Sequence, residues 1–426
     1  MTRHPDRANP VFQTLCMILA GGQGERLYPL TRDRAKPAVL FGGNYRLIDF
    51  TLSNCLNSGV RRIYVLTQYK SDSLHRHVRL GWNLLNPELD EYVEIRSPQQ
   101  RLTSHWYQGT ADAIYQNIYT LQLLRPRYVL VLSGDHVYRM NYLRLIEQHV
   151  ANNADLTIAC IETPIEEAAR LGVISVDVVG RALGFEEKPE VTASLGARDG
   201  TALCSMGVYV FKTEMLVRRV IEDAKNSTSH DFGRDVVPAM IQAGDDVFAF
   251  KFFHENGGAP YWRDIGTLDA YWEAHMDLVR AEPVFDLYDH RWPVRSYAQS
   301  APPFKTMSGG GEPGLPGSEV RNSLVCNGTI IRDGHVSDSV IGRNVRINCG
   351  SRIEESVIMD GVCVGRGVTI RRAVIDKGNH IPDDSTIGVE LEQDRTRFTV
   401  SEGGVVVVPK NMPLFHPPEA QADGSD

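Results

Sequence analysis

The sequence has few cysteines, and they follow no recognisable pattern. Seven occur among 426 residues, with no pair spaced by two residues and no accompanying histidine pattern. Neither a zinc site nor a disulfide framework is therefore indicated. Free thiols suit a reducing compartment, and we expect a cytoplasmic protein.

Long apolar runs and an excess of basic residues are also missing. No run approaches the roughly 20 apolar residues of a membrane span. The segment VFQTLCMILAGG is short and enters a glycine turn, which favours a first buried strand over a signal peptide. The formal net charge is −8, whereas a broad nucleic-acid surface needs basic stripes. We expect neither a membrane nor a nucleic acid as a partner.

Several familiar motifs of nucleotide binding and catalysis are absent as well. The run GGQGERL fails the dinucleotide pattern G-x-G-x-x-G at Leu27, and no G-x-x-x-x-G-K-[ST] loop occurs. There is no G-x-S-x-G nucleophile elbow and no metalloprotease histidine pair. These absences suit a displacement in which the substrate brings its own ionised nucleophile and the protein supplies positioning and charge neutralisation.

A glycine-rich, locally basic segment, LAGGQGERLYPLTRDRAKP, stands against the acidic balance of the chain. Residues 21–46 contain five basic and two acidic side chains, or +3 (five minus two). The basic residues are Arg26, Arg32, Arg34, Lys36 and Arg46. Gly21, Gly22 and Gly24 permit close backbone approach, so their N–H groups can converge on phosphate oxygens. The alternative is a tight strand-to-helix turn without a ligand.

Between residue 15 and about residue 290, apolar strand candidates alternate with helical patterns, as in LCMILAG, RRIYVLTQ and YVLVLSGD. Strands joined by helix-length crossovers predict an α/β domain whose mostly parallel sheet is covered on both faces. Ligands of such sheets lie beyond the carboxyl ends of the strands. LAGGQG and VLSGDH both follow strand candidates, so we expect them at one rim.

Acidic and basic side chains in loops supply the candidate chemistry. Asp135 follows an apolar strand, and Asp264 lies in YWRDIGT. Two such carboxylates suit Mg²⁺ bridging a triphosphate. The alternative is that each Asp forms a turn, as a lone Asp after a strand often does. We interpret the neighbouring His136 as structural. In FEEKP, Lys188 offers a charge for a second phosphate and Glu187 an acceptor for sugar hydroxyls, with a surface ion pair as the alternative. Tyr107 precedes a Gly-Thr turn that opens a helix.

The C-terminal part carries an internal repeat. The motifs SVIG, SVIM and AVID place Ile341, Ile358 and Ile375 17 residues apart, and each starts a ladder with steps of six. All nine ladder positions are β-branched, and extrapolation predicts a less regular first coil at Leu324, Ile330 and Val336. This periodicity predicts a left-handed parallel β-helix of three-sided coils, with an antiparallel sandwich as the alternative.

We therefore predict four segments. They are a catalytic domain at 12–290, a linker rich in Pro, Gly and Ser at 291–318, a β-helix domain for regulation or oligomerisation at 319–412, and a disordered tail at 413–426.

Over residues 15 to about 410 the chain resembles the bacterial ADP-glucose pyrophosphorylases (glucose-1-phosphate adenylyltransferases). The motifs that carry this resemblance are AGGQGERLYPLTRDRAKPAVLFGGNYRLIDFTLSNCLNSG, WYQGTADAI, SGDHVY, FEEKP, SMGVYVF, HDFGRDVVP and YWRDIGTLDAYWEA. The resemblance implies a Rossmann-like nucleotidyltransferase domain, followed by a β-helix. It also implies attack of glucose 1-phosphate on the α-phosphorus of ATP, giving ADP-glucose and pyrophosphate for α-glucan (glycogen) synthesis.

The resemblance also assigns roles to single residues. Asp135 and Asp264 match carboxylates that hold catalytic Mg²⁺, and Arg26 and Lys36 match basic residues on the ATP phosphates. Gln68, Gly109 and Thr110, with the glycines at 21, 22 and 24, fall on the nucleotide side. The matches to glucose 1-phosphate contacts are Tyr107, Gly172, Glu187, Lys188 and Ser205.

Members of this family are usually homotetramers controlled by anionic metabolites. Arg34, Arg46, Lys377 and Lys410 match basic positions of the effector sites. Asp33 and Leu40 replace a lysine and a histidine of the enteric enzymes, so the activator is not fixed by the resemblance. The alternatives are an inactive regulatory subunit and a bifunctional enzyme whose β-helix transfers acyl groups.

Overall fold

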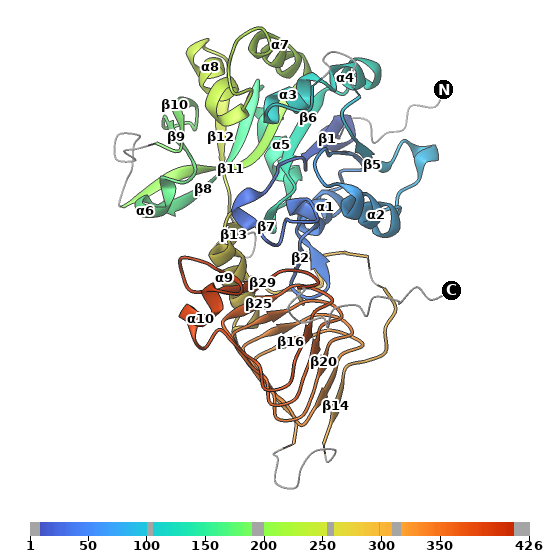
Figure 1. Ribbon diagram of the computed structural model, residues 1–426. Helices are drawn as coiled ribbons and strands as arrows, with labels where there is room; N and C mark the ends of the chain where they lie inside the picture. Colours follow the sequence, from blue (N-terminus) through green and yellow to red (C-terminus); the bar gives the residue numbers. More distant parts are fainter. Residues whose placement is uncertain are drawn as a thin grey trace, which may run out of the picture. The chain divides into compact units, whose positions relative to one another are not determined.

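A computed structural model describes residues 9–99, 105–189, 200–253, 260–297, 299–308 and 317–412 (Figure 1). The predicted tail at 413–426 and residues 298 and 309–316 of the predicted linker lie outside this part. The chain forms two compact units. Unit 1 comprises Met1–Gly22, Ile48–Trp262 and His290–Val294, and unit 2 comprises Gln23–Leu47, Arg263–Asp289 and Arg295–Asp426. The predicted domain limits stay predictions. The two compact units do not coincide with the predicted domains, because residues 23–47 and 263–289 of the predicted catalytic domain group with the β-helix.

Unit 1 is built on one nine-stranded sheet, in the order β10-β9-β11-β6-β1-β4-β5, with β8 pairing with both β11 and β12. The strands are β1 (Thr14–Leu19), β4 (Arg62–Leu66), β5 (Tyr92–Arg96), β6 (Tyr128–Ser133), β8 (Leu156–Pro164), β9 (Gly172–Val176), β10 (Ala182–Glu187), β11 (Thr201–Lys212) and β12 (Val247–Lys251). The neighbouring strands β6, β1, β4 and β5 are parallel, and β11 runs antiparallel to β6, β8 and β9.

Helices cover both faces of this sheet. In β1 the side chains of Leu15 and Met17 join a core with α3 (Thr110–Tyr115), α7 (Thr213–Asp223) and α8 (Val237–Gln242). On the opposite face the Cys16 Sγ lies 3.7 Å from the Cys55 Sγ of α1 (Leu47–Asn57). The other helices of unit 1 are α2 (Asp72–Gly81), α4 (Ile118–Leu124), α5 (Tyr142–Ala151) and α6 (Ile165–Ala168). Strands buried on both faces explain the continuous apolar runs.

The carboxyl ends of β1, β4 and β6 are in register, since Leu19 pairs with Leu66 and with Ser133. The segments that follow these three residues leave the sheet at the same edge. This arrangement confirms the prediction that LAGGQG and VLSGDH lie on one rim.

Unit 2 contains a parallel β-helix with three sheets, visible as the orange to red coils in Figure 1. The first sheet has β14 (Lys305–Met307), β17 (Ile330–Arg332), β20 (Arg346–Ile347), β23 (Cys363–Val364) and β26 (His380–Ile381). The second has β15 (Glu319–Arg321), β18 (His335–Ser337), β21 (Arg352–Glu354), β24 (Thr369–Arg371) and β27 (Thr386–Ile387). The third has β16 (Leu324–Val325), β19 (Val340–Ile341), β22 (Val357–Ile358), β25 (Ala373–Ile375), β29 (Val406–Val408) and β28 (Thr399–Val400).

The predicted 17-residue ladder is confirmed. Ile341, Ile358 and Ile375 pair with one another across the third sheet, and all nine ladder side chains are buried. The extrapolated first coil is wrong on two sides, because Val325 pairs with Ile341 and Ile331 with Ile347. Only Val336 is placed as predicted, opposite Ile353. The first coil therefore has one residue fewer than the later coils.

Segments far from the β-helix in sequence pack within unit 2. Helix α9 (Leu268–Val279) contacts the short strand β2 (Leu40–Phe41), which pairs with β3 (Tyr45–Arg46). The Tyr271 hydroxyl donates to the Leu40 carbonyl (2.6 Å), and the His275 Nε2 accepts from the Gly42 N–H (3.1 Å). Burial lowers the pKa of His275 to about 4, so its ring is neutral and its Nδ1 donates to the Tyr271 carbonyl (2.8 Å).

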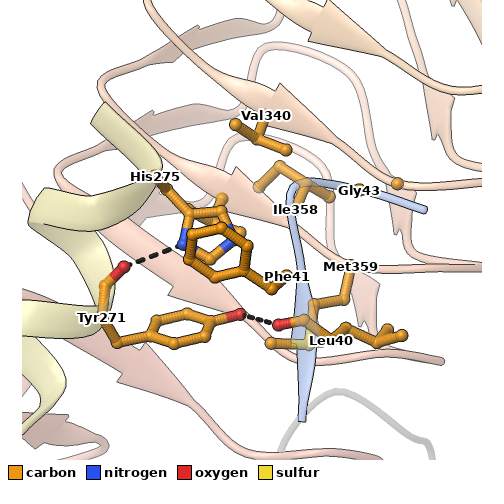
Figure 2. A pocket seen from close by; sticks show the side chains of 10 residues that line it. Leu40, Phe41, Gly43, Tyr271, His275, Val340, Ile358 and Met359 are labelled. Atoms are coloured by element: carbon orange, nitrogen blue, oxygen red, sulfur yellow. Dashed lines mark hydrogen bonds between the residues drawn. The ribbon is translucent and has the colours of Figure 1, made fainter. Parts of the chain in front are cut away.

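Figure 2 shows that the Phe41 ring lies beside His275 in this packing, with a centroid separation of 4.3 Å. The surrounding cavity has a volume of about 10 Å³ and is lined also by Val340 and Ile358. Such a volume holds at most about one water molecule. The side chains around Phe41 and His275 therefore pack α9 and β2 against the β-helix, and they do not form a ligand site.

Within the part of the chain that the structure describes, no helix combines the length and the apolar character that a membrane crossing requires.

The β-helix core yields a stability prediction. Ile370 is buried in the second sheet, so Ile370→Ala removes core contacts and leaves a cavity. We expect a loss of about 2–5 kcal/mol in the free energy of unfolding of unit 2. Urea denaturation should show it, with Val389→Ala as the control. Val389 is 52% exposed and its truncation should cost less than about 0.5 kcal/mol. Equal losses in both variants would contradict the assigned core.

Candidate active site

The predicted phosphate loop begins at the end of β1 in unit 1. A Cβ atom added at Gly21 would lie 3.1 Å from the Cγ of Gln68, while one at Gly22 would meet open space. Of the three glycines, Gly24 is the one that belongs to unit 2; it has φ +66°, and an added Cβ would lie 3.0 Å from the Lys36 Cβ. The Thr31 hydroxyl donates to the Gly24 carbonyl (2.9 Å). Gly24 is thus required by its backbone conformation and by the close return of residues 31–36.

Three predicted catalytic residues gather in unit 2. The Lys36 Nζ lies 3.3 Å from the Asp264 Oδ1. A Cβ added at Gly266 would lie 3.0 Å from the Asp264 Oδ2 and 3.5 Å from a terminal guanidinium nitrogen of Arg26. The Lys36 side chain is 11% exposed, in contrast to the exposed Arg26. The loop therefore brings two cations to one carboxylate, a set of charges suited to polyphosphate oxygens.

Local structure explains how these side chains are held. Lys36 begins a short 3₁₀ helix (Lys36–Ala38) with Pro37 in its first turn. Asp264 ends the short strand β13 (Trp262–Asp264), and Thr267 caps α9 by accepting from the Ala270 N–H (3.2 Å). Lys36 and Asp264 thus stand next to elements that pack on the β-helix.

Asp135 belongs to unit 1, two residues beyond β6. Its carboxylate accepts a short hydrogen bond from the Ser133 hydroxyl, and the His136 Nε2 lies 3.6 Å from its Oδ1. The Trp262 ring packs edge-on against His136 at a centroid distance of 5.1 Å. The side chain of Asp135 is 22% exposed, so this carboxylate is accessible at the strand end.

The residues predicted on the nucleotide side of unit 1 form a hydrogen-bonded loop. The Gln68 side-chain amide accepts from the Tyr107 N–H (2.8 Å) and donates to the Tyr107 carbonyl (3.3 Å). Gly109 leaves no room for a side chain, because an added Cβ would lie 2.2 Å from the His230 carbonyl oxygen. The Thr110 hydroxyl donates to Asp231 (2.9 Å). These contacts fix Gln68 and Thr110, and they show that both side chains already have protein partners.

The predicted sugar-phosphate residues lie around the Glu187 carboxylate. A Cβ added at Gly172 or at Gly233 would lie 2.7 Å from the Glu187 Oε2. The Lys188 Nζ lies 3.1 Å from the Glu187 Oε1, and the Lys188 side chain is half exposed. Lys188 has φ +53°, a conformation that a side chain other than that of glycine rarely adopts. Such backbone strain is common at ligand sites.

Ser205 and Tyr107 are buried nearby in the same unit. The Ser205 hydroxyl lies 3.4 Å from the Tyr209 hydroxyl and accepts from the Gly207 N–H (3.2 Å), at an irregularity in β11. Burial raises the pKa of both Tyr209 and Tyr107. The two phenols are thus neutral hydrogen-bonding groups.

Sequence reasoning missed Asp231 and Asp376. Asp231 accepts from Thr110 and from the N–H groups of Gly233 (2.9 Å) and Arg234 (3.1 Å), and so starts the π-helix Phe232–Val236. The motif HDFGRD contained this signal. Asp376 interrupts the apolar repeat of the β-helix, and this departure was its signal.

The predicted effector residues lie in unit 2. Arg34 is buried in an ion pair with Asp376, and Arg46 donates to the Ala38 carbonyl (3.3 Å). Burial, and then Arg34 and Arg46, lower the pKa of Lys377 to about 8. Lys410 adds a further, smaller lowering of that pKa. The four basic residues thus act on one electrostatic environment, in which Arg34 is paired with the buried carboxylate of Asp376.

Two protein-family models match the chain. The model described as nucleotidyl transferase matches residues 15–281, and the GlmU-like C-terminal hexapeptide model matches residues 302–408. Together with the sheet and the three-sided coil, they confirm the predicted fold class. Parallel sheets in the hexapeptide region are consistent with a left-handed β-helix.

Curated relatives match over nearly their full length. The chain is 46% identical over 413 residues to the glucose-1-phosphate adenylyltransferase of Koribacter versatilis, covering 96% of this chain and 98% of that protein. It is 47% identical to glucose-1-phosphate adenylyltransferase 2 of Vibrio cholerae, covering 93% and 98%. It is also 47% identical to the Rhodopirellula baltica glucose-1-phosphate adenylyltransferase, covering 95% and 92%. The chain therefore belongs to the glucose-1-phosphate adenylyltransferase family.

Proposed function

We propose that the protein transfers the adenylyl group of ATP to α-D-glucose 1-phosphate, giving ADP-glucose and pyrophosphate, the first committed step of glycogen or α-glucan synthesis. The observation that carries this proposal is the nearly full-length match to relatives named glucose-1-phosphate adenylyltransferase. The grouping of Arg26, Lys36 and Asp264 in unit 2 supports it, because adenylyl transfer needs charge neutralisation at a triphosphate.

The reaction asks little covalent chemistry of the protein. An oxygen of the sugar phosphate forms a bond to the α-phosphorus as the bond from that phosphorus to the bridging oxygen breaks, and pyrophosphate leaves. The nucleophile is already ionised, so no protein base is required. Within unit 2, Lys36 and Arg26 would neutralise charge on the phosphate oxygens, with Lys36 pre-positioned by its burial.

Within unit 1, Gly21, Gly22, Gln68, Gly109 and Thr110 would contact the nucleotide. Here Gln68 and Thr110 hold the loop, and the glycines admit the ligand close to the backbone. Lys188 would bind the phosphate of glucose 1-phosphate, and Glu187 its sugar hydroxyls. Tyr107, Gly172 and Ser205 would complete the sugar-phosphate site.

We propose Mg²⁺ as the cofactor, with Asp135 and Asp264 as its protein ligands. Both carboxylates are partly exposed, and oxygen ligands of this kind, few in number, are what Mg²⁺ takes when phosphates supply the rest. The bound ion would neutralise charge on the phosphate oxygens. Lys36 already partners Asp264 (3.3 Å), which holds that carboxylate in place.

The remaining parts of the proposal concern control and assembly. Arg34, Arg46, Lys377 and Lys410 would form the environment of anionic metabolite effectors, and the protein would be a cytoplasmic homotetramer. The concentration of basic groups around Lys377 supports the effector assignment, since cations crowded in a partly buried place are stabilised by a bound anion.

Nucleotide preference is the first test. Purified protein with Mg²⁺, glucose 1-phosphate and either ATP or UTP should release pyrophosphate with a clear preference for ATP, measured as kcat/KM for each nucleotide. Product identity should be checked as ADP-glucose by chromatography. A preference for UTP would overturn the substrate assignment.

Asp135→Asn tests the metal carboxylate. The amide keeps the shape of the side chain but loses the charge, so we expect kcat to fall by about 100-fold or more. Pyrophosphate release at saturating Mg²⁺ measures it. Asp90→Asn is the control, because Asp90 is an exposed carboxylate paired with Arg62 and should retain wild-type turnover. Full activity of Asp135→Asn would remove Asp135 from the metal site.

Lys377 should make effector binding depend on pH. With a pKa of about 8, Lys377 is charged at pH 7 and mostly neutral at pH 9. Affinity for sulfate, an anion that does not titrate in this range, should therefore fall by up to about tenfold as pH rises from 7 to 9. Calorimetry on wild type and Lys377→Arg measures the change, since the arginine stays charged and should flatten the profile. Identical pH profiles of wild type and Lys377→Arg would exclude Lys377 from the effector site. A parallel titration of Lys410→Ala with sulfate tests the same role for Lys410.

A further inference from the structure

Asp376 places a charged side chain at a buried position of the β-helix where the equivalent residues of the two preceding coils are uncharged. Ile341, Ile358 and Ile375 are partners in the ladder, so the residues that follow them are equivalent, namely Gly342, Met359 and Asp376. Asp376 is 1% exposed. The same place in the preceding coil is filled by an apolar methionine, so the fold itself does not require a carboxylate there. A buried charge is costly unless it is paired, so this one calls for another explanation.

The partner of Asp376 comes from the phosphate-loop segment. The Arg34 guanidinium donates to Oδ1 from both terminal nitrogens (3.1 and 3.0 Å) and to Oδ2 from one of them (2.8 Å). Arg34 is 4% exposed, so the pair is desolvated on both sides. A forked, buried contact of this kind fixes orientation as well as distance.

Further hydrogen bonds tie this pair to the C-terminal segment of unit 2. Asp376 Oδ1 accepts from the Lys377 N–H (2.7 Å), and the Asn379 side-chain amide donates to the carbonyls of Asp376 (2.7 Å) and Pro409 (2.9 Å). The Arg32 guanidinium donates to the Lys410 carbonyl (2.8 Å). Residues 32–34, 376–379 and 409–410 thus form one network, which we call the coil-end network.

The coil-end network is linked along the chain to the proposed catalytic charges, with a single residue between Arg34 and Lys36. Arg34 is followed by the buried Ala35 and then by Lys36, whose Nζ lies 3.3 Å from Asp264. Lys36 begins a 3₁₀ helix that leads into β2, where Tyr271 bonds to Leu40; His275 bonds to Gly42 just after β2. The backbone of Lys36 is therefore anchored on one side by the Arg34–Asp376 pair and on the other by α9.

We propose that Asp376 is a positioning residue for adenylyl transfer: through Arg34 it holds Lys36 at the place from which its ammonium group meets the ATP phosphates. It also joins Lys36 to the backbone of Lys377, so anion binding at Lys377 is transmitted to the catalytic lysine by this pair. Asp376 itself touches neither substrate. The inference rests on the proposed function and extends it to how the β-helix controls the reaction.

The test uses two substitutions of Asp376 and one matched control in the full-length enzyme. Asp376→Asn keeps the shape and removes the charge, and Asp376→Met installs the residue that the preceding coil has at this position. Asp360→Asn is the control, because Asp360 lies one coil earlier at a comparable corner and pairs with Arg343 (2.9 Å) instead of with residues 32–36.

For both Asp376 variants we expect kcat/KM for ATP to fall about tenfold or more, with the KM for glucose 1-phosphate within twofold of wild type. The response to anionic effectors should weaken in parallel. Hydrogen exchange of peptides covering residues 28–39 should become faster in Asp376→Asn and stay unchanged in Asp360→Asn. Adding Arg34→Met to Asp376→Met should cause little further loss, because the two residues act as one pair.

Folded Asp376 variants with kcat/KM for ATP within twofold of wild type would overturn the proposal. A loss shared equally by both substrates, or failure of both variants to fold, would make Asp376 structural and overturn it as well. Failure of the proposed function is a separate result: wild type would then make no ADP-glucose, while hydrogen exchange would still report whether Asp376 holds residues 28–39.

Discussion

The attachment of the phosphate loop and of α9 to the β-helix is the constraint on which unit 2 depends. The Tyr271 hydroxyl and the neutral His275 ring satisfy backbone groups of residues 40–42, and the Arg34–Asp376 pair fixes the chain a few residues earlier. Between these two anchors lies Lys36. A flexible loop bearing the same charges would lose part of its binding energy to ordering, whereas this one is ordered before any ligand arrives.

This arrangement gives the β-helix a role beyond that of an appended domain. Arg26, Lys36 and Asp264 fold with the β-helix in unit 2, while Asp135, Glu187 and Lys188 fold with the sheet in unit 1. The two basic residues proposed to neutralise the ATP phosphates and the residues proposed to recognise the sugar phosphate are thus built on separate frameworks. The proposed regulation by anions near Lys377 would act on residues of the same framework as Lys36, which is a short physical route from the effector site to the catalytic lysine.

Much of this was predictable from the sequence, because the signals were periodic or local. The 17-residue ladder fixed nine buried positions, and apolar runs followed by glycine or aspartate located the rim of the sheet. The first coil was misplaced by one residue on two sides because its shorter turn leaves no mark in composition. The Arg34–Asp376 pair joins residues 342 positions apart, and no single-sequence pattern links them. Asp376 was nevertheless visible as a charge inside an apolar repeat.

The last coil also determines how the β-helix ends. A stack of parallel coils finishes in unpaired strand edges, which invite pairing with another molecule. Here β29 continues the third sheet and β28 closes it in the antiparallel direction, while the short helix α10 (Leu391–Arg395) and Phe398 bring apolar side chains to the core. The chain that returns at residues 391–408 therefore acts as a cap against end-to-end stacking. A protein shortened before this segment would expose an aggregation-prone surface, and Arg32 and Asn379 would lose their hydrogen bonds to the carbonyls of Lys410 and Pro409.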